Sequence, residues 1–257
     1  MPTQPVINGW VEPAAAPVLQ EGEVHIWLCP PCTQATAGEV LSEEERTRAA
    51  AFRREDLRTA YVGSHVALRH ILATYTQMPP RQLSFTRGRW GKPGLVSSPE
   101  LHFNLSHSGG YALIVVALEG PVGIDLEDMS APAPFDVVPT ICTPTEQELL
   151  ARTDKGRRDD VFYALWTRKE ALAKAMGLGL ALDLRKLEVW RGLTEEVSQP
   201  GICSSISAPY PWHVFALPTI PGMAAALAAP ARSLRCMHWL YPSSGLPAAS
   251  GGYGSAG

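Results

Sequence analysis

Two carboxylates stand one residue apart inside an apolar stretch of the chain. Residues 122–128, VGIDLED, have the pattern of a buried strand and include Asp125 and Glu127. Because side chains alternate across a strand, both carboxylates project from one face. Close like charges in a partly buried place raise a pKa or require a cation, and oxygen ligands favour a hard ion such as magnesium. The alternative is a strand that has reached the surface, with both acids solvated.

A third acid lies on a predicted helix further along the chain. In WTRKEALAKAMG at 166–177, Glu170 and Lys174 are one turn apart at the edge of an apolar arc, and Lys169 is near its middle. The arc consists of Phe162, Leu165, Trp166, Leu172, Ala173 and Met176. Charges at the rim of such an arc lie where the helix meets another element. The simpler interpretation is an exposed i,i+4 ion pair, which stabilises a helix by only about 0.2–0.5 kcal/mol.

A serine and a histidine come directly after another apolar strand. Ser106 and His107 belong to NLSHSGGYA at 104–112, where the glycines let a ligand approach the backbone closely. Neighbouring side chains on an extended segment point apart, and no G-x-S-x-G turn is present. The pattern therefore argues against a Ser-His nucleophile.

Basic residues gather in two segments upstream. FRREDLR at 52–58 and RGRWGKPGL at 87–95 contribute Arg53, Arg54, Arg58, Arg87, Arg89 and Lys92. Any one of them is expected to be a solvated surface charge. Together with a cation site made of three carboxylates, they indicate a phosphate-rich ligand.

The elements that must position these residues form a pattern that occurs twice. The first copy has a strand at 23–29, a helix with a capping box of Ser42 and Glu45, a longer helix at about 56–76, and two strands that meet at Gly109 and Gly110. The second copy begins with a strand at 121–127 and a helix that has Thr143, Pro144 and Glu146 at its N-cap, first and third positions. A helix at 159–180 and strands near 186–191, 202–207, 211–217 and 223–229 complete it.

This repeat predicts an α+β fold with an N-terminal half at 21–119 and a C-terminal half at 120–241. VHIWLC at 24–29 corresponds to VGIDLE at 122–127, so Trp27 and Cys29 stand where the second copy has its acids. Only the C-terminal half is therefore expected to carry the charged site.

The two ends of the chain have a different composition. Residues 1–20 and 242–257 are rich in Pro, Gly, Ala and Ser and carry little apolar surface, so we expect both to be disordered. The CPPC sequence from Cys29 to Cys32 has redox or half-zinc spacing, but no second Cys/His pair completes a metal site. A strand end that turns through two prolines is the favoured interpretation.

Composition excludes several classes of protein. The chain has 257 residues, 46% of them hydrophobic, which predicts a globular protein. A net charge of −3 gives no overall basic field for nucleic acid. No apolar run reaches the roughly 18 residues needed to span a bilayer, so we expect a cytoplasmic protein without a membrane contact. Five scattered cysteines are expected to be reduced thiols.

These motifs together resemble a known family. GKPGL, FNLSHS, VGIDLE and LWTRKEALAKAMGLGL occur in the order and approximate spacing of the phosphopantetheinyl transferases. The chain is similar, over roughly residues 22–240, to the longer, monomeric type that activates peptide and polyketide synthetases. VGIDLE and WTRKEALAKAMG are highly specific in combination, whereas either alone would be weak.

The resemblance implies a reaction and a fold. Such an enzyme uses magnesium to move the 4′-phosphopantetheine arm of coenzyme A to a serine of an apo carrier protein, and it releases adenosine 3′,5′-bisphosphate. The fold would be a pseudodimer of two similar α+β halves, with coenzyme A in the cleft between them.

The resemblance also implies roles for single residues. Asp125, Glu127 and Glu170 are the expected magnesium ligands, and Lys174 matches a lysine near the bridging phosphates. Glu170 is also the candidate base for the carrier serine, with a metal-bound water as the alternative. The expected contacts to coenzyme A are Ser106 and His107 at its phosphates, Lys92 and Pro93 beside its adenine, and one of Arg53, Arg54 and Arg58 at its 3′-phosphate.

Two other functions stay open on sequence grounds. A non-catalytic homologue could bind coenzyme A or a carrier protein, although acids at all three positions argue against it. A metal-dependent phosphodiesterase would form its product with water alone, without any carrier.

Overall fold

The structure, a computed structural model, describes residues 9–31, 37–191, 201–203, 211–218, 220–230, 234–242 and 246. Its strands are β1 (Glu23–Cys29), β2 (Phe85–Arg87), β3 (Pro93–Leu95), β4 (His102–Ser108), β5 (Tyr111–Ala117), β6 (Gly123–Asp128), β7 (Gly201–Cys203), β8 (Trp212–Ala216), β9 (Met223–Ala229) and β10 (Arg235–Leu240). Its α-helices are α1 (Ala37–Val40), α2 (Glu43–Ala50), α3 (Glu55–Thr76), α4 (Val138–Ile141), α5 (Pro144–Arg152) and α6 (Arg158–Met176). Short 3₁₀ turns are at Pro80–Gln82, Phe135–Val137, Lys155–Arg157, Gly179–Ala181 and Leu184–Lys186. The mixture of helices and strands confirms the predicted α+β class.

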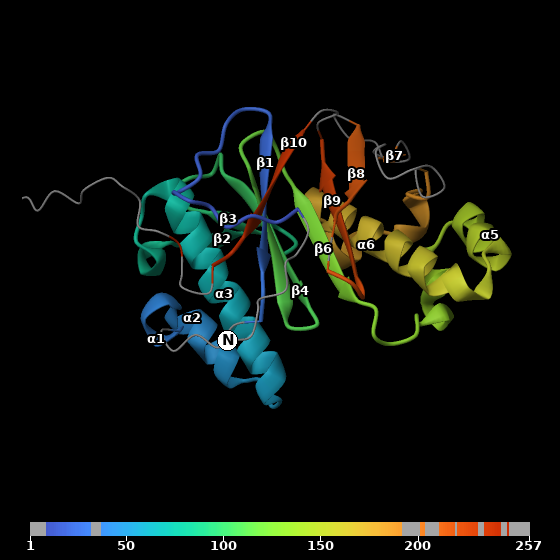
Figure 1. The fold of residues 1–257 in the computed structure, drawn as a ribbon, viewed down its shortest axis with the longest axis horizontal. Coiled ribbons are helices and arrows are strands. Elements are labelled where there is room, and N and C mark those ends of the chain that lie inside the picture. The colour runs from blue at the N-terminus through green and yellow to red at the C-terminus, as the bar shows by residue number, and fades with distance from the viewer. Residues whose placement is uncertain are drawn as a thin grey trace, which may run out of the picture.

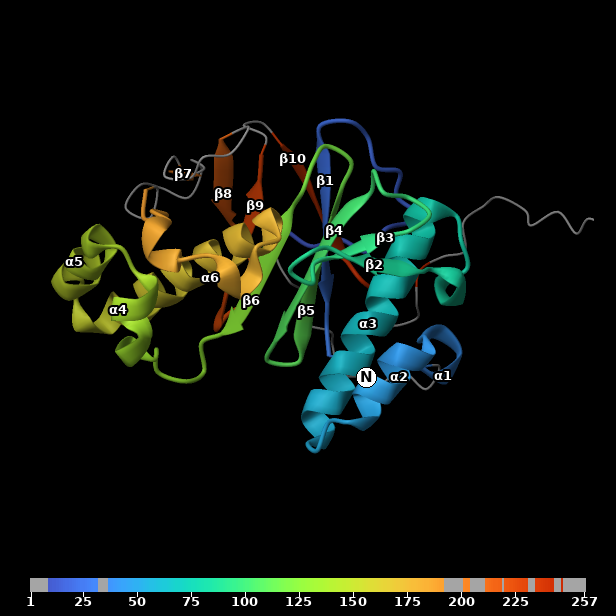
Figure 2. The ribbon, with the colours of Figure 1, turned by 180° about the vertical axis from the view of Figure 1, so that it is seen from behind.

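Two four-stranded sheets form the centre of the fold. Their strand orders are β10-β1-β5-β4 and β6-β9-β8-β7, and β2 pairs with β3 in a separate hairpin. Figures 1 and 2 show α3 and α6 on opposite sides of these sheets. One apolar cluster joins side chains of β1 and β5 to those of β6 and β9, so the inner faces of the two sheets pack on each other.

The outer face of each sheet packs against one long helix. Ala67, Leu68, Ile71 and Leu72 of α3 share a cluster with β1, β4 and β5. Leu165, Ala171, Leu172 and Ala175 of α6 share another with β8 and β9. Since side chains alternate along a strand, each central strand has one face toward the other sheet and one toward its helix.

Local signals in the sequence position these elements correctly. Both predicted capping boxes are present: the Ser42 and Thr143 side chains accept from the backbone N–H of Glu45 and Glu146, whose carboxylates accept in return. The predicted turn at Gly109 and Gly110 joins β4 to β5, and both glycines have positive φ.

The chain termini differ from the prediction. Trp10 is buried and Val11 pairs with Trp239, so the expectation of disorder as far as residue 20 is wrong for these residues. Leu246 packs against the core of the N-terminal half. The rest of both predicted tails, residues 1–8, 243–245 and 247–257, and also Cys32, lie outside the described residues.

The boundary of the two halves also differs. β10 belongs by sequence to the predicted C-terminal half, but it pairs in parallel with β1 in the first sheet (Figure 1). Its pairing partner is almost the whole chain length away, and no local pattern encodes such a partner. The first sheet is therefore built from both ends of the chain.

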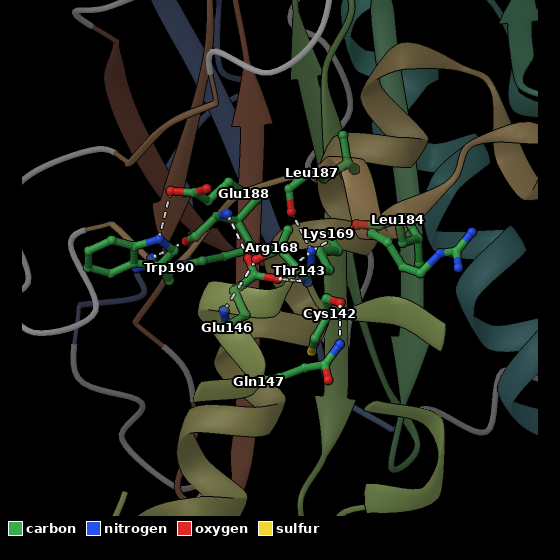
Figure 3. A network of polar contacts seen from close by, with 12 residues as sticks. Cys142, Thr143, Glu146, Gln147, Arg168, Lys169, Leu184, Leu187, Glu188 and Trp190 are labelled. Atoms are coloured by element: carbon green, nitrogen blue, oxygen red, sulfur yellow. Dashed lines mark hydrogen bonds and ion pairs between the residues drawn. The ribbon is translucent and has the colours of Figure 1, made fainter. Parts of the chain in front are cut away.

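The strand expected at 186–191 is absent from the described structure. Figure 3 shows instead that charged side chains hold the backbone of this segment. The Arg168 guanidinium donates to the carbonyls of Val189 and Arg191, and Glu146 accepts from the Val189 amide. The backbone groups are satisfied without a sheet, which explains why an extended apolar pattern did not become a strand. Of the strand expected at 202–207, residues 201–203 form β7 and the remainder lies outside the described residues.

Candidate functional site

Polar side chains of β4 join the edges of the two sheets. The Asn104 side-chain oxygen accepts from the Ile124 amide at 2.9 Å, Ser106 Oγ from the Leu126 amide at 3.3 Å, and Ser108 Oγ from the Asp128 amide at 3.0 Å. Every second residue of one edge strand thus bonds every second amide of the other. This side-chain ladder leads directly to the predicted carboxylates.

Asp125 is 2% exposed and lies between the two halves of the chain. Its Oδ1 accepts from Ser106 Oγ at 2.9 Å and from Lys174 Nζ at 2.6 Å. Burial raises the pKa of Asp125 to about 6, although the neighbouring Lys174 charge opposes the rise. The predicted alternative of two solvated acids is therefore wrong for Asp125.

The Ser106 hydroxyl makes all the hydrogen bonds that it can make beside Asp125. It donates to Asp125, and it accepts from the Leu126 amide and from Lys174 Nζ, the latter at 3.0 Å. One donated and two accepted bonds are all that a serine hydroxyl can make. The serine orients the carboxylate and the lysine, which agrees with the sequence argument against a nucleophile.

The close approach of β6 to α6 depends on Gly123. A Cβ atom there would lie 2.0 Å from the Ala171 carbonyl oxygen and 2.3 Å from the Ala175 amide nitrogen. Both atoms belong to the helix backbone and cannot move aside. This contact brings Asp125 of the strand within reach of Lys174 of the helix.

Glu127 and Glu170 complete the predicted set of acids. Glu127 Oε1 accepts from the Trp166 indole at 2.8 Å, and its Oε2 accepts from Ser108 Oγ at 3.4 Å. Burial raises the pKa of Glu170, and the charge of Glu127 raises it further, against the effect of Lys174. The charge of Glu127 raises the pKa of Asp125 in the same way, so Glu127 couples to both other acids.

The described residues contain no group of three or more His, Cys, Asp or Glu side chains with the geometry of a metal site. The donor set nevertheless fits a hard cation. Asp125 Oδ2 is buried and has no hydrogen-bond partner among the described residues, and the charge of Glu127 acts on both Asp125 and Glu170. In this structure Lys174 supplies the positive charge at Asp125.

A cavity of about 640 Å³ begins beside these charged groups. Glu170 and Lys174 form part of its wall. The other lining residues are Pro139, Thr140, Ala173, Gly179, Leu182, Asp183, Leu184 and Arg185. The cavity wall thus combines charged groups with apolar side chains.

Lys92 does not lie free in a cavity, as a residue beside an adenine would. Its Nζ donates to the carbonyls of Val122 at 2.8 Å and Ala175 at 2.9 Å, and burial lowers its pKa to about 8. Lys92 therefore joins the β2–β3 hairpin to the start of β6 and the end of α6. Pro93, the next residue, begins β3 and lines a separate small cavity.

The predicted arginines occupy the surface near the start of α3. Arg53 is exposed, Arg54 pairs with Asp56, and Arg58 pairs with Glu55. His107 is exposed on the opposite side of β4 from Ser106, and desolvation, followed by the Lys174 charge, lowers its pKa. The structure thus brings Ser106, Lys174 and the acids together, but it does not bring these three arginines to them.

Sequence reasoning missed most of a second group of polar residues beside β4, of which it had named Arg87. A cavity of about 220 Å³ is lined by Arg48, Tyr61, His65 and Arg87, among others, and by Asn104 of the ladder. The Arg48 guanidinium lies 5.7 Å from the Tyr61 ring centroid, and Arg87 pairs with Glu44 at 2.6 Å. Burial lowers the pKa of His65 to about 4. Arg48 had no signal in the sequence beyond its place near the end of a capped helix.

Comparison with known proteins covers both halves of the chain. The family model described as 4′-phosphopantetheinyl transferase, N-terminal, matches residues 26–119, and that of the 4′-phosphopantetheinyl transferase superfamily matches residues 121–222. A putative 4′-phosphopantetheinyl transferase of Synechocystis is 36% identical over 63% of this chain and 68% of its own length. The transferase HetI of Nostoc is 32% identical over 70% and 79%. Sfp of Bacillus subtilis is 31% identical over 58% of this chain and 66% of its own length, just under two thirds.

Among the described residues, none of the helices has the length and apolar composition of a membrane span.

The matches to both family models confirm the expected longer type, because the N-terminal half and the half with the carboxylates each resemble the corresponding part of these enzymes. The chain belongs to the 4′-phosphopantetheinyl transferase family.

Proposed function

We propose that this protein transfers the 4′-phosphopantetheine arm of coenzyme A to a serine of an apo carrier protein and releases adenosine 3′,5′-bisphosphate. The observation that carries the proposal is the hydrogen-bonded cluster of Asp125, Ser106 and Lys174, in which Lys174 lines a 640 Å³ cavity, in a chain of this family. The reaction needs charge compensation at a pyrophosphate and room for a long neutral arm, and this site offers both.

Asp125, Glu127 and Glu170 would hold a magnesium ion. When bound, the ion polarises phosphoryl oxygens and offsets the charge that develops on them. The unpartnered Asp125 Oδ2 and the repulsion of Glu127 with Asp125 and with Glu170 support this assignment.

Glu170 and Lys174 have the properties that proton transfer and charge neutralisation require. The carrier serine is a weak nucleophile and needs a base within hydrogen-bond reach or one water away. The raised pKa of Glu170 makes it a stronger base than a solvated glutamate. Lys174 is 29% exposed, so its ammonium can offset charge on the departing bisphosphate while Ser106 keeps it close to Asp125.

The two cavities suggest where the parts of coenzyme A bind. The larger one, which has Ala173, Leu182 and Leu184 in its wall beside charged groups, suits the pantetheine arm. The smaller one has Arg48 and Arg87 in its wall, and arginines bind phosphate groups well. We therefore assign the 3′-phosphate to these two arginines rather than to Arg53, Arg54 or Arg58. Ser106 and His107 remain the expected contacts to the other phosphates. Lys92 takes a structural role between the halves.

The pseudodimer with a cleft between its halves is part of the same proposal. It is supported by the matching layers, in which β1 packs under α3 and β6 under α6. A monomer in the cytoplasm, with an acyl or peptidyl carrier protein as partner, remains the expectation from the sequence.

Mass spectrometry of several apo carrier proteins, incubated with the enzyme, coenzyme A and magnesium, tests the function. We expect the carrier to gain the mass of one phosphopantetheine, and a control carrier with its acceptor serine changed to alanine to stay unmodified. Cleavage of coenzyme A by water without a carrier would instead identify a phosphodiesterase. Binding of coenzyme A with no product in either case would identify a non-catalytic homologue.

A further inference from the structure

A charged pair between α5 and α6 lies fully buried in the C-terminal half. Lys169 and Glu146 are both 0% exposed, and Lys169 Nζ lies 2.7 Å from Glu146 Oε2 (Figure 3). Taking both charges out of water costs free energy that their attraction alone does not always recover. Apolar residues of similar volume could fill the same space, so packing alone does not explain why a charged pair is buried here.

The remaining bonds of the pair go to one segment of backbone. Lys169 Nζ donates to the Leu184 carbonyl at 2.9 Å and to the Leu187 carbonyl, so all three of its hydrogens are used. Glu146 Oε1 accepts from the Val189 amide at 2.8 Å, and its Oε2 accepts from the Thr143 amide at 2.9 Å. The pair therefore ties 184–189 to α5 and α6 together.

The start of that segment and the residues just before it form part of the wall of the larger cavity. The wall includes Leu182, Asp183, Leu184 and Arg185, together with Glu170, Ala173 and Lys174 of α6. Lys169 precedes Glu170 in α6. The same turn of helix therefore places Glu170 at the cavity and, through Lys169, attaches Leu184 of the wall. The segment pairs with no strand among the described residues, and its polar attachment at Leu184 and Leu187 comes from Lys169, whereas Arg168 holds the carbonyls of Val189 and Arg191.

We propose that Lys169 and Glu146 are positioning residues: their buried pair holds the 182–185 wall at the right distance from α6 and so sets how tightly the protein binds the pantetheine arm of coenzyme A. This inference rests on the proposed function of the cavity. The pair should affect the binding of coenzyme A but not that of adenosine 3′,5′-bisphosphate, because the bisphosphate lacks the arm and does not need this wall.

The test uses the paired variant Lys169→Met with Glu146→Gln, which removes both charges and leaves neither alone in the core. The second change keeps an oxygen acceptor for the α5 cap, whereas the carbonyls of Leu184 and Leu187 lose their donor. We expect the KM and the dissociation constant for coenzyme A to rise about tenfold, within the ~10²-fold that a displacement of about 1 Å can cost. The kcat at saturation and the affinity for adenosine 3′,5′-bisphosphate should change less than about twofold.

The matched control is Val214→Ala, which removes buried apolar atoms from the same core but is not part of the cavity wall. It should lower the melting temperature and leave both affinities unchanged, so that lost stability alone cannot explain the result. If the paired variant does not fold, Glu146→Gln alone must show the same direction: weaker coenzyme A and unchanged bisphosphate.

Equal coenzyme A affinity in a folded variant and the wild type would overturn the positioning role, as would an equal loss for both ligands. The proposed function fails separately: a wild-type protein that neither binds coenzyme A nor modifies a carrier would reject it before any variant is compared.

Discussion

The N-terminal and C-terminal halves contain the same polar arrangement in different settings. In the first half, the capping-box residue Glu45 pairs with Arg69 of α3 at 2.7 Å, and Arg69 donates to the carbonyls of Pro80 and Leu83. In the second half, the capping-box residue Glu146 pairs with Lys169 of α6, which donates to the carbonyls of Leu184 and Leu187. In both halves, a cation on the long helix links a capped helix to two carbonyls three residues apart.

The strand beneath each helix differs in chemistry. Trp27 of β1 is 0% exposed, and its indole donates to the Tyr75 hydroxyl of α3 at 2.9 Å. At the corresponding place in β6, Asp125 accepts from Lys174 of α6. One half therefore closes the strand–helix contact with neutral groups, whereas the other half places charges there.

The position of each strand in its sheet suggests why. β1 lies between β10 and β5, so its neighbours close it off on both sides, whereas β6 is at the edge of its described sheet, beside the serines of β4. β6 therefore has no strand neighbour in its own sheet on the side where the polar side chains of β4 reach it. The same framework becomes a site where the strand is at an edge and its helix contact is ionic.

The largest expected effect is that of Asp125→Ala. Transfer should fall at least ~10²-fold, the scale for loss of one electrostatic stabiliser, and the chain should remain folded. The equivalent change in the other half, Trp27→Ala, should instead reduce the free energy of unfolding by about 3–5 kcal/mol. Steady-state transfer rates and thermal unfolding of both variants measure this contrast. Normal turnover by Asp125→Ala would contradict the assignment of the site to the C-terminal half.

Glu170→Gln tests the chemistry of the charged half more finely. The change keeps the size and one oxygen but removes the negative charge and the basicity, so kcat should fall by about 10–10²-fold while coenzyme A still binds. An exposed ion pair predicts almost no kinetic effect. Measurement of kcat and of coenzyme A affinity on the same preparation separates the roles: unchanged kcat would remove Glu170 from the mechanism.

Lys92→Met tests the contact between the halves through its pH dependence. The pKa of Lys92 is about 8 in the folded protein, below its ordinary value, so the unfolded chain binds more protons between these two values. The contribution of Lys92 to the free energy of unfolding should therefore increase as the pH rises above about 8, by on the order of 1–3 kcal/mol in total.

Urea unfolding of the wild type and Lys92→Met from pH 7 to 10.5 measures this contribution as a difference. The wild type should gain stability relative to the variant over that range. Parallel curves for the two proteins would show that Lys92 is not buried as described.

The smallest effect is expected at the counterpart of Glu170. His70 directly follows Arg69, as Glu170 follows Lys169, and its Nδ1 lies 2.7 Å from the Tyr241 hydroxyl. His70→Gln should change kcat less than about twofold, because this contact is structural. A large loss of kcat with an unchanged melting temperature would contradict the division of roles between the halves.

The sequence by itself determined the features that depend on neighbouring residues. The capping boxes at Ser42 and Thr143, the glycine turn between β4 and β5, and the shared face of Asp125 and Glu127 all follow from hydrogen bonds within a few residues or from the strand period. The order of motifs along the chain also identified the family, because VGIDLE and WTRKEALAKAMG occur together at a spacing typical of these enzymes.

Only the tertiary structure decided which distant groups meet. The parallel pairing of β10 with β1, the side-chain ladder between β4 and β6, and the attachment of 184–191 by Glu146, Arg168 and Lys169 join residues far apart in sequence. A polar residue in a sequence has many possible partners, and burial selects the one that satisfies its hydrogen bonds. For this reason Lys92 bonds two carbonyls and Lys174 pairs with Asp125, whereas Arg54 and Arg58 pair on the surface.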